Sequence, residues 1–241
     1  MTSHTLLGVV IVSIVFPFSS PSNKLNLIRW WHRRLLAALN LQVTAHGFVP
    51  QAHQVIVSTM IVANHISWLD IHALNSMVPL RFIAKSDIKH WPVIGFLAKR
   101  ADVLFVERDK RKDAVRIAHL TASSLSAGDN LCLFPEGATT DGTKMMPFKS
   151  SIMQAVIHAN ATVQAVAIRY PHHHGGINTA MAYANETTMK QSIFQILQQK
   201  NPTVELHFLA PIVTAQLTNE DKDRRKLTLQ IEQNIRATLG L

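Results

Sequence analysis

Acidic side chains are missing from the start of this sequence: none of the first 69 residues is Asp or Glu, and Asp70 is the first carboxylate. Over its 241 residues the chain has a formal net charge of +9 and a pI of about 10.0. Such a charge favours anionic partners: nucleic acid, an acidic carrier protein or an anionic lipid surface. Only two Tyr and four Trp occur, and there is no Lys/Arg tail, so nucleic acid is the weakest of these options.

Cysteine is almost absent as well. The single one, Cys132, excludes an internal disulfide and fits a reducing compartment. It lies within LCLF, an apolar run typical of a buried strand, where a thiol behaves as a small hydrophobic side chain. We therefore expect Cys132 to be buried and not to act as a nucleophile.

The N-terminal apolar stretch is too short for a simple membrane span. Leu6 to Phe18 comprises 13 uncharged residues, whereas a spanning helix needs about 20. A cleaved signal peptide is disfavoured, because no Lys or Arg precedes the stretch and no small-x-small site follows it. The whole chain is nevertheless 47% hydrophobic and only 16% charged, a balance that leans towards membrane association.

The next segment, KLNLIRWWHRRLLAALNL, combines an apolar stripe with positive charge. The apolar residues at helical spacing are Leu27, Trp30, Trp31, Leu35 and Leu39. The cations are Lys24, Arg29, Arg33 and Arg34. A basic amphipathic helix that carries Trp is typical of a segment lying among the headgroups of an anionic membrane. A helix packed on the protein's own core gives the same pattern and stays open as an alternative.

These features predict two parts. Residues 1–45 should form an apolar, hairpin-like anchor with a basic amphipathic helix, embedded in one leaflet as a peripheral or monotopic element. Residues 46–241 should form the folded domain. Because the positive charge follows the apolar stretch, this domain should face the cytoplasm at the cytoplasmic membrane.

After about residue 53, short apolar runs alternate with helical patterns. We expect strands at 55–63, 81–84, 102–106, 131–134, 163–168 and 204–209. We expect helices at 68–77, 109–127, 150–159, 190–200 and 220–239, with a helical region interrupted by Pro92 between the second and third strands. This order is typical of an α/β fold: a mixed, mostly parallel sheet flanked by helices.

Several expected strands end in polar residues. The first ends in Asn64 and His65, another is followed by ERDK, another by PEG and another by Arg169 and Tyr170. Ligands of open α/β sheets bind outside the carboxyl ends of the strands. The sequence therefore predicts one site assembled from distant parts of the chain.

The stretch ANHISWLD has two interpretations. Ser67 and Asp70 fit a capping box, in which a side chain at the third helical position returns to the N-cap backbone. His65 suggests a second role for Asp70. On a continuous helix the two would lie about 140° apart. In a strand-to-turn-to-helix corner, Asp70 can reach the imidazole, fix its tautomer and leave the other ring nitrogen as a general base. Both roles are compatible.

NHISWLD resembles the NHxxxxD signature of the glycerolipid acyltransferases, the lysophosphatidate acyltransferase group. In order along the chain, VLFVER (Val103–Arg108), LFPEG (Leu133–Gly137) and VQAVAIRY (Val163–Tyr170) resemble the later blocks of that family. The resemblance covers roughly residues 45–210. NHxxxxD alone is a modest signal, but NHxxxxD followed by FVER and FPEG is specific.

The resemblance implies an O-acyltransferase. His65 is then the general base that deprotonates an acceptor hydroxyl, and Asp70 orients it. The hydroxyl attacks an acyl thioester, either acyl-carrier protein or acyl-CoA, without an acyl-enzyme, and no cofactor or metal is implied. Arg108 would bind the acceptor's phosphate, and Glu136 and Gly137 would shape the acceptor or oxyanion region. The remaining residues expected to bind substrate are Asn64, Ser67, Phe134, Pro135 and Thr139.

Two departures from the family pattern bear on the acceptor. Many members continue FPEG as TRS, but this chain has Ala138, Thr139 and Thr140, so a phosphate-binding Arg is missing. The fourth block usually contains a Pro where this chain has Ala165. Losing one charge-assisted phosphate contact costs a few kcal/mol. The expected acceptor is 1-acyl-glycerol-3-phosphate, with another lysolipid such as lyso-ornithine lipid as the alternative.

Other interpretations are weaker. Lys144 or Lys149 could replace the missing Arg, although both fit a solvated loop. PHHHGG (residues 171–176) is expected to be a loop and not a metal site, because no Asp, Glu or Cys accompanies it. An inactive lipid-binding module on the same scaffold is the second functional hypothesis, and a nucleic-acid binder is the third.

Overall fold

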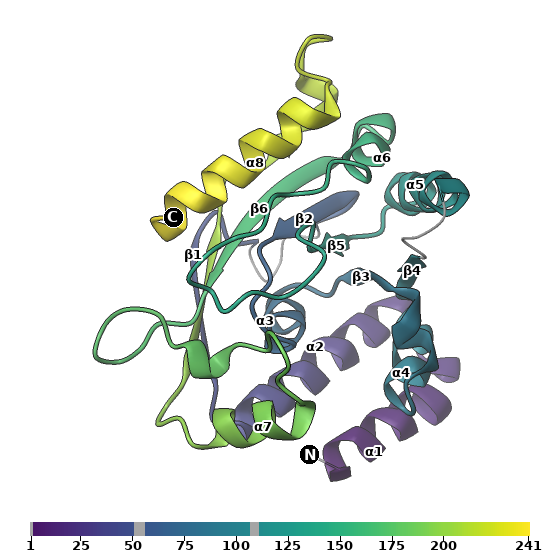
Figure 1. Ribbon diagram of the computed structural model, residues 1–241. Coiled ribbons are helices and arrows are strands. Elements are labelled where there is room, and N and C mark those ends of the chain that lie inside the picture. Colours follow the sequence, from purple (N-terminus) through teal and green to yellow (C-terminus); the bar gives the residue numbers. More distant parts are fainter. Residues whose placement is uncertain (1, 51–55, 107–110) are drawn as a thin grey trace.

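The computed structural model describes residues 2–50, 56–106 and 111–241 and contains one mixed sheet with helices on both faces (Figure 1). Its strand order is β1-β7-β6-β2-β5-β3-β4, with β8 beside β6. The strands are β1 (Gln42–Gly47), β2 (Thr59–Ala63), β3 (Arg81–Lys85), β4 (Leu104–Val106), β5 (Leu131–Leu133), β6 (Thr162–Arg169), β7 (Thr203–Phe208) and β8 (Ile212–Val213).

The middle of the sheet is parallel. Strand β2 pairs in parallel with both β5 and β6, and β3 pairs in parallel with β5 and β4. Strands β7 and β8 run antiparallel to β6, and β1 runs parallel to β7. The expectation of a mixed, mostly parallel sheet flanked by helices is therefore confirmed.

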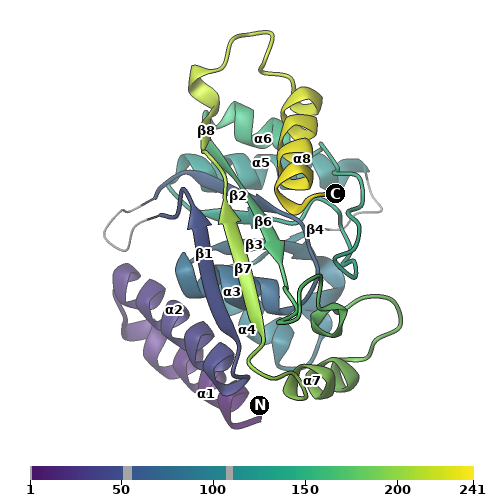
Figure 2. The ribbon, with the colours of Figure 1, turned by 90° about the vertical axis from the view of Figure 1, so that its left-hand side faces the viewer.

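Helices cover both faces of this sheet. The α-helices are α1 (Thr2–Val10), α2 (Pro21–Ala38), α3 (Leu69–Met77), α4 (Ile94–Arg100), α5 (Arg111–Ser126), α6 (Met153–His158), α7 (Met189–Leu197) and α8 (Arg224–Leu239). Shorter helical segments are η1 (Ile11–Val15), η2 (Phe16–Phe18), η3 (Ser86–His90), η4 (Thr179–Met181) and η5 (Thr214–Gln216). Helices α2, α3 and α7 pack on one face, and α5, α6 and α8 pack on the other (Figures 1 and 2).

Strand β2 shows why the sequence folds this way. All five of its residues are buried. Ile61 and Ala63 pack towards α3, whereas Met60 and Val62 pack towards α5, α6 and α8. A strand with this alternation and no polar face is typical of a parallel strand covered on both sides. Strand β2 therefore fixes the turn that follows it, which contains His65.

Two strands were not predicted. Strand β1 is an edge strand with a mostly exposed or half-exposed pattern, and β8 has only two residues. Neither carries the apolar run that indicates a buried strand. The boundary expected after residue 45 falls inside β1, so the sheet begins before that boundary.

The N-terminal residues form a helical hairpin. Helix α1 continues through η1 and η2, the chain turns at Ser19 and Ser20, and α2 returns (Figure 2). The side chain of Ser20 caps α2 by accepting a hydrogen bond from the Asn23 amide. Among the described residues, no helix has both the length and the apolar content needed to cross a bilayer.

The apolar stripe of α2 is divided between two environments. Leu35 and Leu39 are buried in the core against α3, as the alternative of a core-packed helix predicted. Leu27 and Trp31 instead pack on a small cluster formed by η1 and η2, and Trp30 remains exposed. The outward apolar surface of the hairpin is therefore supplied mainly by α1, η1 and η2.

Candidate active site

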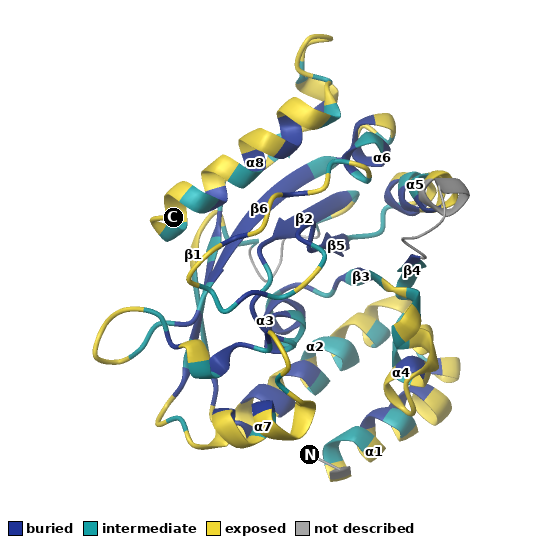
Figure 3. Cartoon of the chain, in the orientation of Figure 1, coloured by how far each residue is buried: buried dark blue, intermediate teal, exposed yellow. Residues whose placement is uncertain are grey.

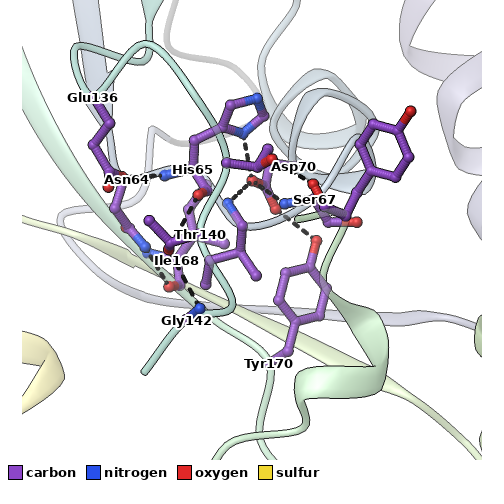
Figure 4. A network of polar contacts seen from close by, with 12 residues as sticks. Asn64, His65, Ser67, Asp70, Glu136, Thr140, Gly142, Ile168 and Tyr170 are labelled. Carbon is purple, nitrogen blue, oxygen red and sulfur yellow. Dashed lines mark hydrogen bonds and ion pairs between the residues drawn. The ribbon is translucent and has the colours of Figure 1, made fainter. Parts of the chain in front are cut away.

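Three parallel strands bring their carboxyl ends together at one edge of the sheet. His65 follows β2, Glu136 follows β5 and Tyr170 follows β6, and β2 lies between the other two strands. Figure 4 shows their side chains converging on one polar network. The predicted site assembled from strand ends is thus present for these three strands. The fourth predicted end, with Glu107 and Arg108, lies outside the described residues.

His65 and Asp70 form a hydrogen-bonded dyad. The imidazole Nδ1 lies 2.8 Å from Oδ2 of Asp70. The same oxygen accepts hydrogen bonds from the backbone amides of Ile66 at 2.8 Å and Ser67 at 2.9 Å. Oδ1 accepts one from the Tyr170 hydroxyl at 2.7 Å. Because Asp70 accepts at both oxygens, Nδ1 of His65 must be the donor, and this tautomer leaves the lone pair on Nε2.

The two members of the dyad differ in exposure. The Asp70 side chain is fully buried, whereas 17% of the His65 side chain is exposed. Nε2 has no hydrogen-bond partner among the residues that the structure describes. A buried carboxylate with four donors is held in one position, while its partner, the His65 side chain, stays partly exposed. This arrangement fits a general base.

The capping box is only half formed. The backbone amide of Ser67 donates to the Asp70 carboxylate, as a capping box requires. The amide of Asp70, however, donates to the Ser67 carbonyl and not to its hydroxyl, and the N-cap position of α3 is Trp68. Ser67 is therefore not the N-cap that the sequence predicted. The Asp70 carboxylate binds the backbone amides of the turn before α3 and the His65 imidazole at the same time. Both predicted roles of Asp70 are therefore present.

Other contacts fix the histidine from further directions. Oε1 of Glu136 accepts a hydrogen bond from the His65 amide at 2.7 Å, and the Thr140 amide donates to the His65 carbonyl at 2.9 Å. The Phe134 ring stacks on the imidazole, with 3.9 Å between centroids and 8° between planes. Thr140 was not predicted to belong to the site. Its signal in the sequence is only its position shortly after FPEG.

Glu136 and Asn64 support the backbone. Oε2 of Glu136 also accepts from the Met146 amide at 2.7 Å, so this one carboxylate joins the β2 and β5 loops. Burial raises the pKa of the Glu136 carboxyl, and its hydrogen bonds from the Met146 and His65 amides oppose that rise. Asn64 makes two hydrogen bonds to the Ile168 backbone and extends the pairing of β2 with β6. The buried side chains of Asn64 and Glu136 are therefore hydrogen-bonded within the protein, and the contact of these residues and of Ser67 with substrate stays a prediction.

The rest of the FPEG region forms a tight loop. Gly137 adopts φ +83°, a conformation that favours glycine, and its amide donates to the Phe134 carbonyl at 3.2 Å. The Pro135 carbonyl accepts from the Lys149 amide at 3.1 Å. The Thr139 hydroxyl donates to the Tyr183 carbonyl. These bonds hold the loop beside His65 without placing an additional cation there.

Cys132 and the histidine-rich loop after β6 do not take part in the hydrogen-bond network around His65. Burial raises the pKa of the Cys132 thiol well above its usual value, so the thiol stays protonated and Cys132 packs as a core residue. His173 and His174 are exposed on the loop after β6, which a bridge between Pro171 and Ile177 closes. Among the described residues, no cluster of three or more His, Cys, Asp or Glu side chains could hold a metal ion.

Comparison with known proteins identifies the family. Residues 40–169 match the family model described as Acyltransferase. The chain is 34% identical to the 1-acyl-sn-glycerol-3-phosphate acyltransferase of Neisseria meningitidis serogroup B, over 86% of this chain and 78% of that protein. The chain belongs to the acyltransferase family. This acyltransferase is also 34% identical to the lyso-ornithine lipid O-acyltransferase of Pseudomonas aeruginosa, over 88% of this chain and 78% of that protein.

A solved structure shares the fold. The 1-acyl-sn-glycerophosphate acyltransferase PlsC from Thermotoga maritima superposes with a TM-score of 0.65, covering 99% of this acyltransferase and 94% of that chain. The two are only 18% identical, so this comparison concerns the fold alone. It includes the N-terminal hairpin, since almost the whole chain is covered.

Proposed function

We propose that this acyltransferase transfers a fatty acyl group from an acyl thioester to the free hydroxyl of a lysolipid, with His65 as the general base and Asp70 as the residue that orients it. One observation carries the proposal. The buried Asp70 carboxylate holds Nδ1 of His65 at 2.8 Å, which leaves Nε2 of this partly exposed side chain able to accept a proton. No resident cofactor is needed, because the thioester supplies the leaving group.

The proposed reaction is a direct transfer. Nε2 of His65 takes the proton of the acceptor hydroxyl while the oxygen attacks the thioester carbonyl carbon. The resulting tetrahedral intermediate collapses, the carbon–sulfur bond breaks and the thiolate leaves. The imidazolium returns its proton to the thiolate, giving an ester and a free thiol. General-base assistance of this kind typically contributes 10²- to 10⁴-fold.

For the acceptor, we propose 1-acyl-glycerol-3-phosphate, with lyso-ornithine lipid as the second candidate. The first is named in the relative from Neisseria and the second in the relative from Pseudomonas, at equal identity. The missing Arg after FPEG favours testing the second, because Thr139 at that position binds the Tyr183 carbonyl and provides no charge. Lys144 and Lys149 are exposed in the following loop. Arg108 keeps its proposed role as the phosphate contact.

We also propose that the enzyme works at the cytoplasmic face of a membrane. The helical hairpin exposes Leu6, Val10, Ile14 and Phe18, while α2 carries four cations without a carboxylate. Apolar side chains beside positive charge bind the interface of anionic lipid. Either acyl-carrier protein or acyl-CoA fits as donor.

The dyad is tested by replacement. His65→Ala and Asp70→Asn should each lower kcat by at least about 100-fold, measured as thiol release with a lysolipid acceptor. Far-ultraviolet circular dichroism and the melting temperature check the fold. A folded Asp70→Asn variant with normal turnover would show that Asp70 only closes the corner. Product formation by the wild type, in turn, separates an enzyme from an inactive lipid-binding module.

An acceptor panel decides the substrate. The purified full chain is incubated with labelled acyl-CoA or acyl-carrier protein and with 1-acyl-glycerol-3-phosphate, lyso-ornithine lipid or a zwitterionic lysophospholipid. The proposal expects the highest kcat/KM for the phosphate-bearing acceptor. A clear preference for lyso-ornithine lipid would assign the second candidate. No product with any lysolipid would contradict the proposed function.

A further inference from the structure

A short apolar tip projects between η3 and α4. Four consecutive residues, Trp91, Pro92, Val93 and Ile94, are exposed, and Phe96 is exposed two residues further on. The exposed fractions of Trp91, Val93 and Ile94 are all close to 45%. Water-soluble surfaces rarely present such a run unless it meets an apolar partner. We refer to residues 91–96 as the tip.

The backbone holds the tip in a strained shape. Val93 has φ +63° and ψ −54°, and the Ile94 amide donates to the Pro92 carbonyl at 2.6 Å, which defines a γ-turn of the rare type. A β-branched residue seldom adopts positive φ, and such strain persists where the surroundings impose it. The neighbouring Gly95 packs closely on η3, since a Cβ at Gly95 would lie 2.3 Å from the Lys89 carbonyl oxygen. The tip is therefore folded tightly back on η3, with its apolar side chains outward.

The tip is continuous with the N-terminal hairpin. Leu97, in α4, packs on the cluster of Ile11, Val12 and Phe16 from η1 and η2. Figures 1 and 3 show α4 beside this end of the hairpin, with exposed residues on the outer side of both. Helix α4, which begins within the tip, therefore connects the tip to the apolar cluster of the hairpin.

Positive charge surrounds the tip. Lys89, Lys99 and Arg100 are exposed in η3 and α4. The carboxylate of this segment, Asp87, lies 2.5 Å from the Lys85 ammonium. An apolar centre with a cationic rim matches the boundary between acyl chains and anionic headgroups. For a protein partner, this cationic rim would add less to the binding free energy unless the partner's surface were acidic.

The tip also lies at the catalytic edge of the sheet. It follows the carboxyl end of β3, which is parallel to β5. The Phe82 ring of β3 stacks on Phe134 with 5.9 Å between centroids, and Phe134 stacks on His65. A row of aromatic rings therefore leads from the dyad towards the strand that carries the tip.

From these observations we propose that the tip is a second lipid-inserting element, which enters the same leaflet as the N-terminal hairpin and holds the catalytic edge against it. The inference rests on the proposed membrane function, because it assigns a further contact to the same surface. Its partner is a leaflet that contains anionic lipid.

The test places one fluorescent probe at a time. Cys132 is fully buried, so a thiol-reactive, polarity-sensitive dye labels an introduced cysteine. The variants are Ile94→Cys in the tip, Val10→Cys in α1 and, as a matched exposed control, Leu229→Cys in α8 on the opposite face of the sheet. Each labelled full-length protein is mixed with vesicles of phosphatidylcholine and phosphatidylglycerol, and lipids with a quencher on the acyl chain report depth.

We expect a blue shift and quenching for Ile94→Cys and Val10→Cys, and neither for Leu229→Cys. A probe at Ile94 that stays in water while the probe at Val10 enters lipid overturns the proposed tip and leaves membrane binding intact. If neither probe enters lipid, the proposed membrane function itself fails. If only the probe at Ile94 responds, the tip inserts without the hairpin, and the proposed joint insertion of the two elements is overturned.

A functional measurement gives a second, independent readout. Ile94→Ser should weaken vesicle binding about 10-fold, the equivalent of ~1.4 kcal/mol of lost apolar transfer. It should lower kcat/KM for a vesicle-bound acceptor by a similar factor and leave turnover of a monomeric short-chain acceptor unchanged. Leu229→Ser serves as the control and should change neither. Equal effects of Ile94→Ser on both acceptors would indicate a folding defect and contradict the inference.

Discussion

At the scale of single residues, the dyad depends on a carboxylate whose hydrogen-bonding capacity is used by the protein itself. Asp70 accepts from two backbone amides, one imidazole and one phenol. Burying a charge is costly unless it is paired or hydrogen-bonded, so these four donors are what make a fully buried Asp70 possible. His65 and Asp70 were predictable because they lie close in sequence. Tyr170 lies 100 residues from Asp70, and no local pattern signals that contact.

Tyr170→Phe tests the contribution of the fourth donor. The Tyr170 side chain is fully buried, and the substitution removes only the hydroxyl that donates to Oδ1 of Asp70. We expect a loss of ~1–3 kcal/mol in the free energy of unfolding, because a buried charged acceptor loses a partner, and a fall in kcat with little change in KM. Urea unfolding and steady-state kinetics measure both.

The matched control for this variant is Tyr183→Phe. The contacts of Tyr183 beside the site come from its backbone, which accepts from Thr139 and donates to the Ile66 carbonyl. The substitution leaves that backbone in place, so stability and kcat should remain close to those of the wild type. Similar kinetics for both variants would show that the Tyr170 hydroxyl does not position Asp70.

Glu136→Gln removes the charge of a second carboxylate in the site and keeps nearly the same side-chain shape. Both carboxylate oxygens of Glu136 accept from backbone amides, those of His65 and Met146. A glutamine has nearly the same shape, but it must point its NH2 group at one of these two N–H donors. We therefore expect a loss of ~1–3 kcal/mol in the free energy of unfolding, measured by urea unfolding, together with lower kcat. An unchanged stability would mean that one amide needs no acceptor there.

At the scale of elements, the dyad helix is joined to the N-terminal hairpin by histidines. His32 on α2 and His72 on α3 lie 2.7 Å apart between their Nδ1 atoms, and His32 Nε2 lies 3.1 Å from the side-chain nitrogen Nδ2 of Asn75. His72 is on the same helix as Asp70, two residues further on. Sequence patterns could predict both helices, but not a contact between them, because neither histidine belongs to a motif. The contact nevertheless links the hairpin to the helix that positions the dyad.

This histidine pair predicts a loss of stability in acid. Burial, with the nearby His4 as a smaller cause, lowers the pKa of His72 from 6.5 to about 3, and burial lowers the pKa of His32 as well. Between pH 6.5 and 3 the unfolded chain therefore binds a proton at His72 that the folded chain does not. The free energy of unfolding is therefore highest above pH 6.5. As the pH falls below 6.5, it decreases by about 1.4 kcal/mol per pH unit for one such group.

The measurement is urea unfolding at pH 7.5 and pH 5.0. We expect the wild type to lose ~2 kcal/mol more than His72→Gln over this interval, because glutamine does not titrate. His158→Gln, which changes an exposed histidine on α6, should retain the wild-type dependence on pH. If the stability of His72→Gln depends on pH as the wild type's does, His72 is not a group that the folded protein keeps buried and neutral.

At the scale of the whole molecule, the centre of the fold was predictable and its margins were not. Strands β2, β5 and β6 are mostly apolar and mostly buried, so their runs stood out in the sequence. Strand β1 lies at the edge and is half exposed, and the register that places it beside β7 spans about 160 residues. The direction of β7 is likewise a property of packing and has no local signal. For the same reason, the site residues that directly follow strand ends could be predicted from the sequence. Thr140 could not, because it reaches the site through a loop that folds back.

The distribution of charge leads to a prediction for the entire molecule. Positive charge lies on α2, but part of it serves the fold, because Nε of Arg33 donates to the Ser76 carbonyl at 2.8 Å and so joins α2 to α3. Burial lowers the pKa of Arg29, whereas the Arg34 guanidinium lies 5.7 Å from the centre of the Trp30 ring of its own helix. Lys24 and Arg34 are therefore the two cations of α2 chosen for replacement. Each cation near an anionic surface contributes about 1 kcal/mol, equivalent to roughly 5-fold in binding.

We therefore expect Lys24→Gln with Arg34→Gln to weaken binding to anionic vesicles by ~20- to 30-fold and to leave binding to neutral vesicles almost unchanged. Vesicle co-sedimentation at low and high salt measures this, and the difference should shrink as salt screens the charges. Arg225→Gln with Lys226→Gln on α8, at the opposite face of the sheet, removes the same net charge and should have little effect. Equal losses for the two pairs would mean that net charge alone governs binding. A loss confined to the α2 pair would instead show that the enzyme meets the membrane in one orientation, with the hairpin against the lipid.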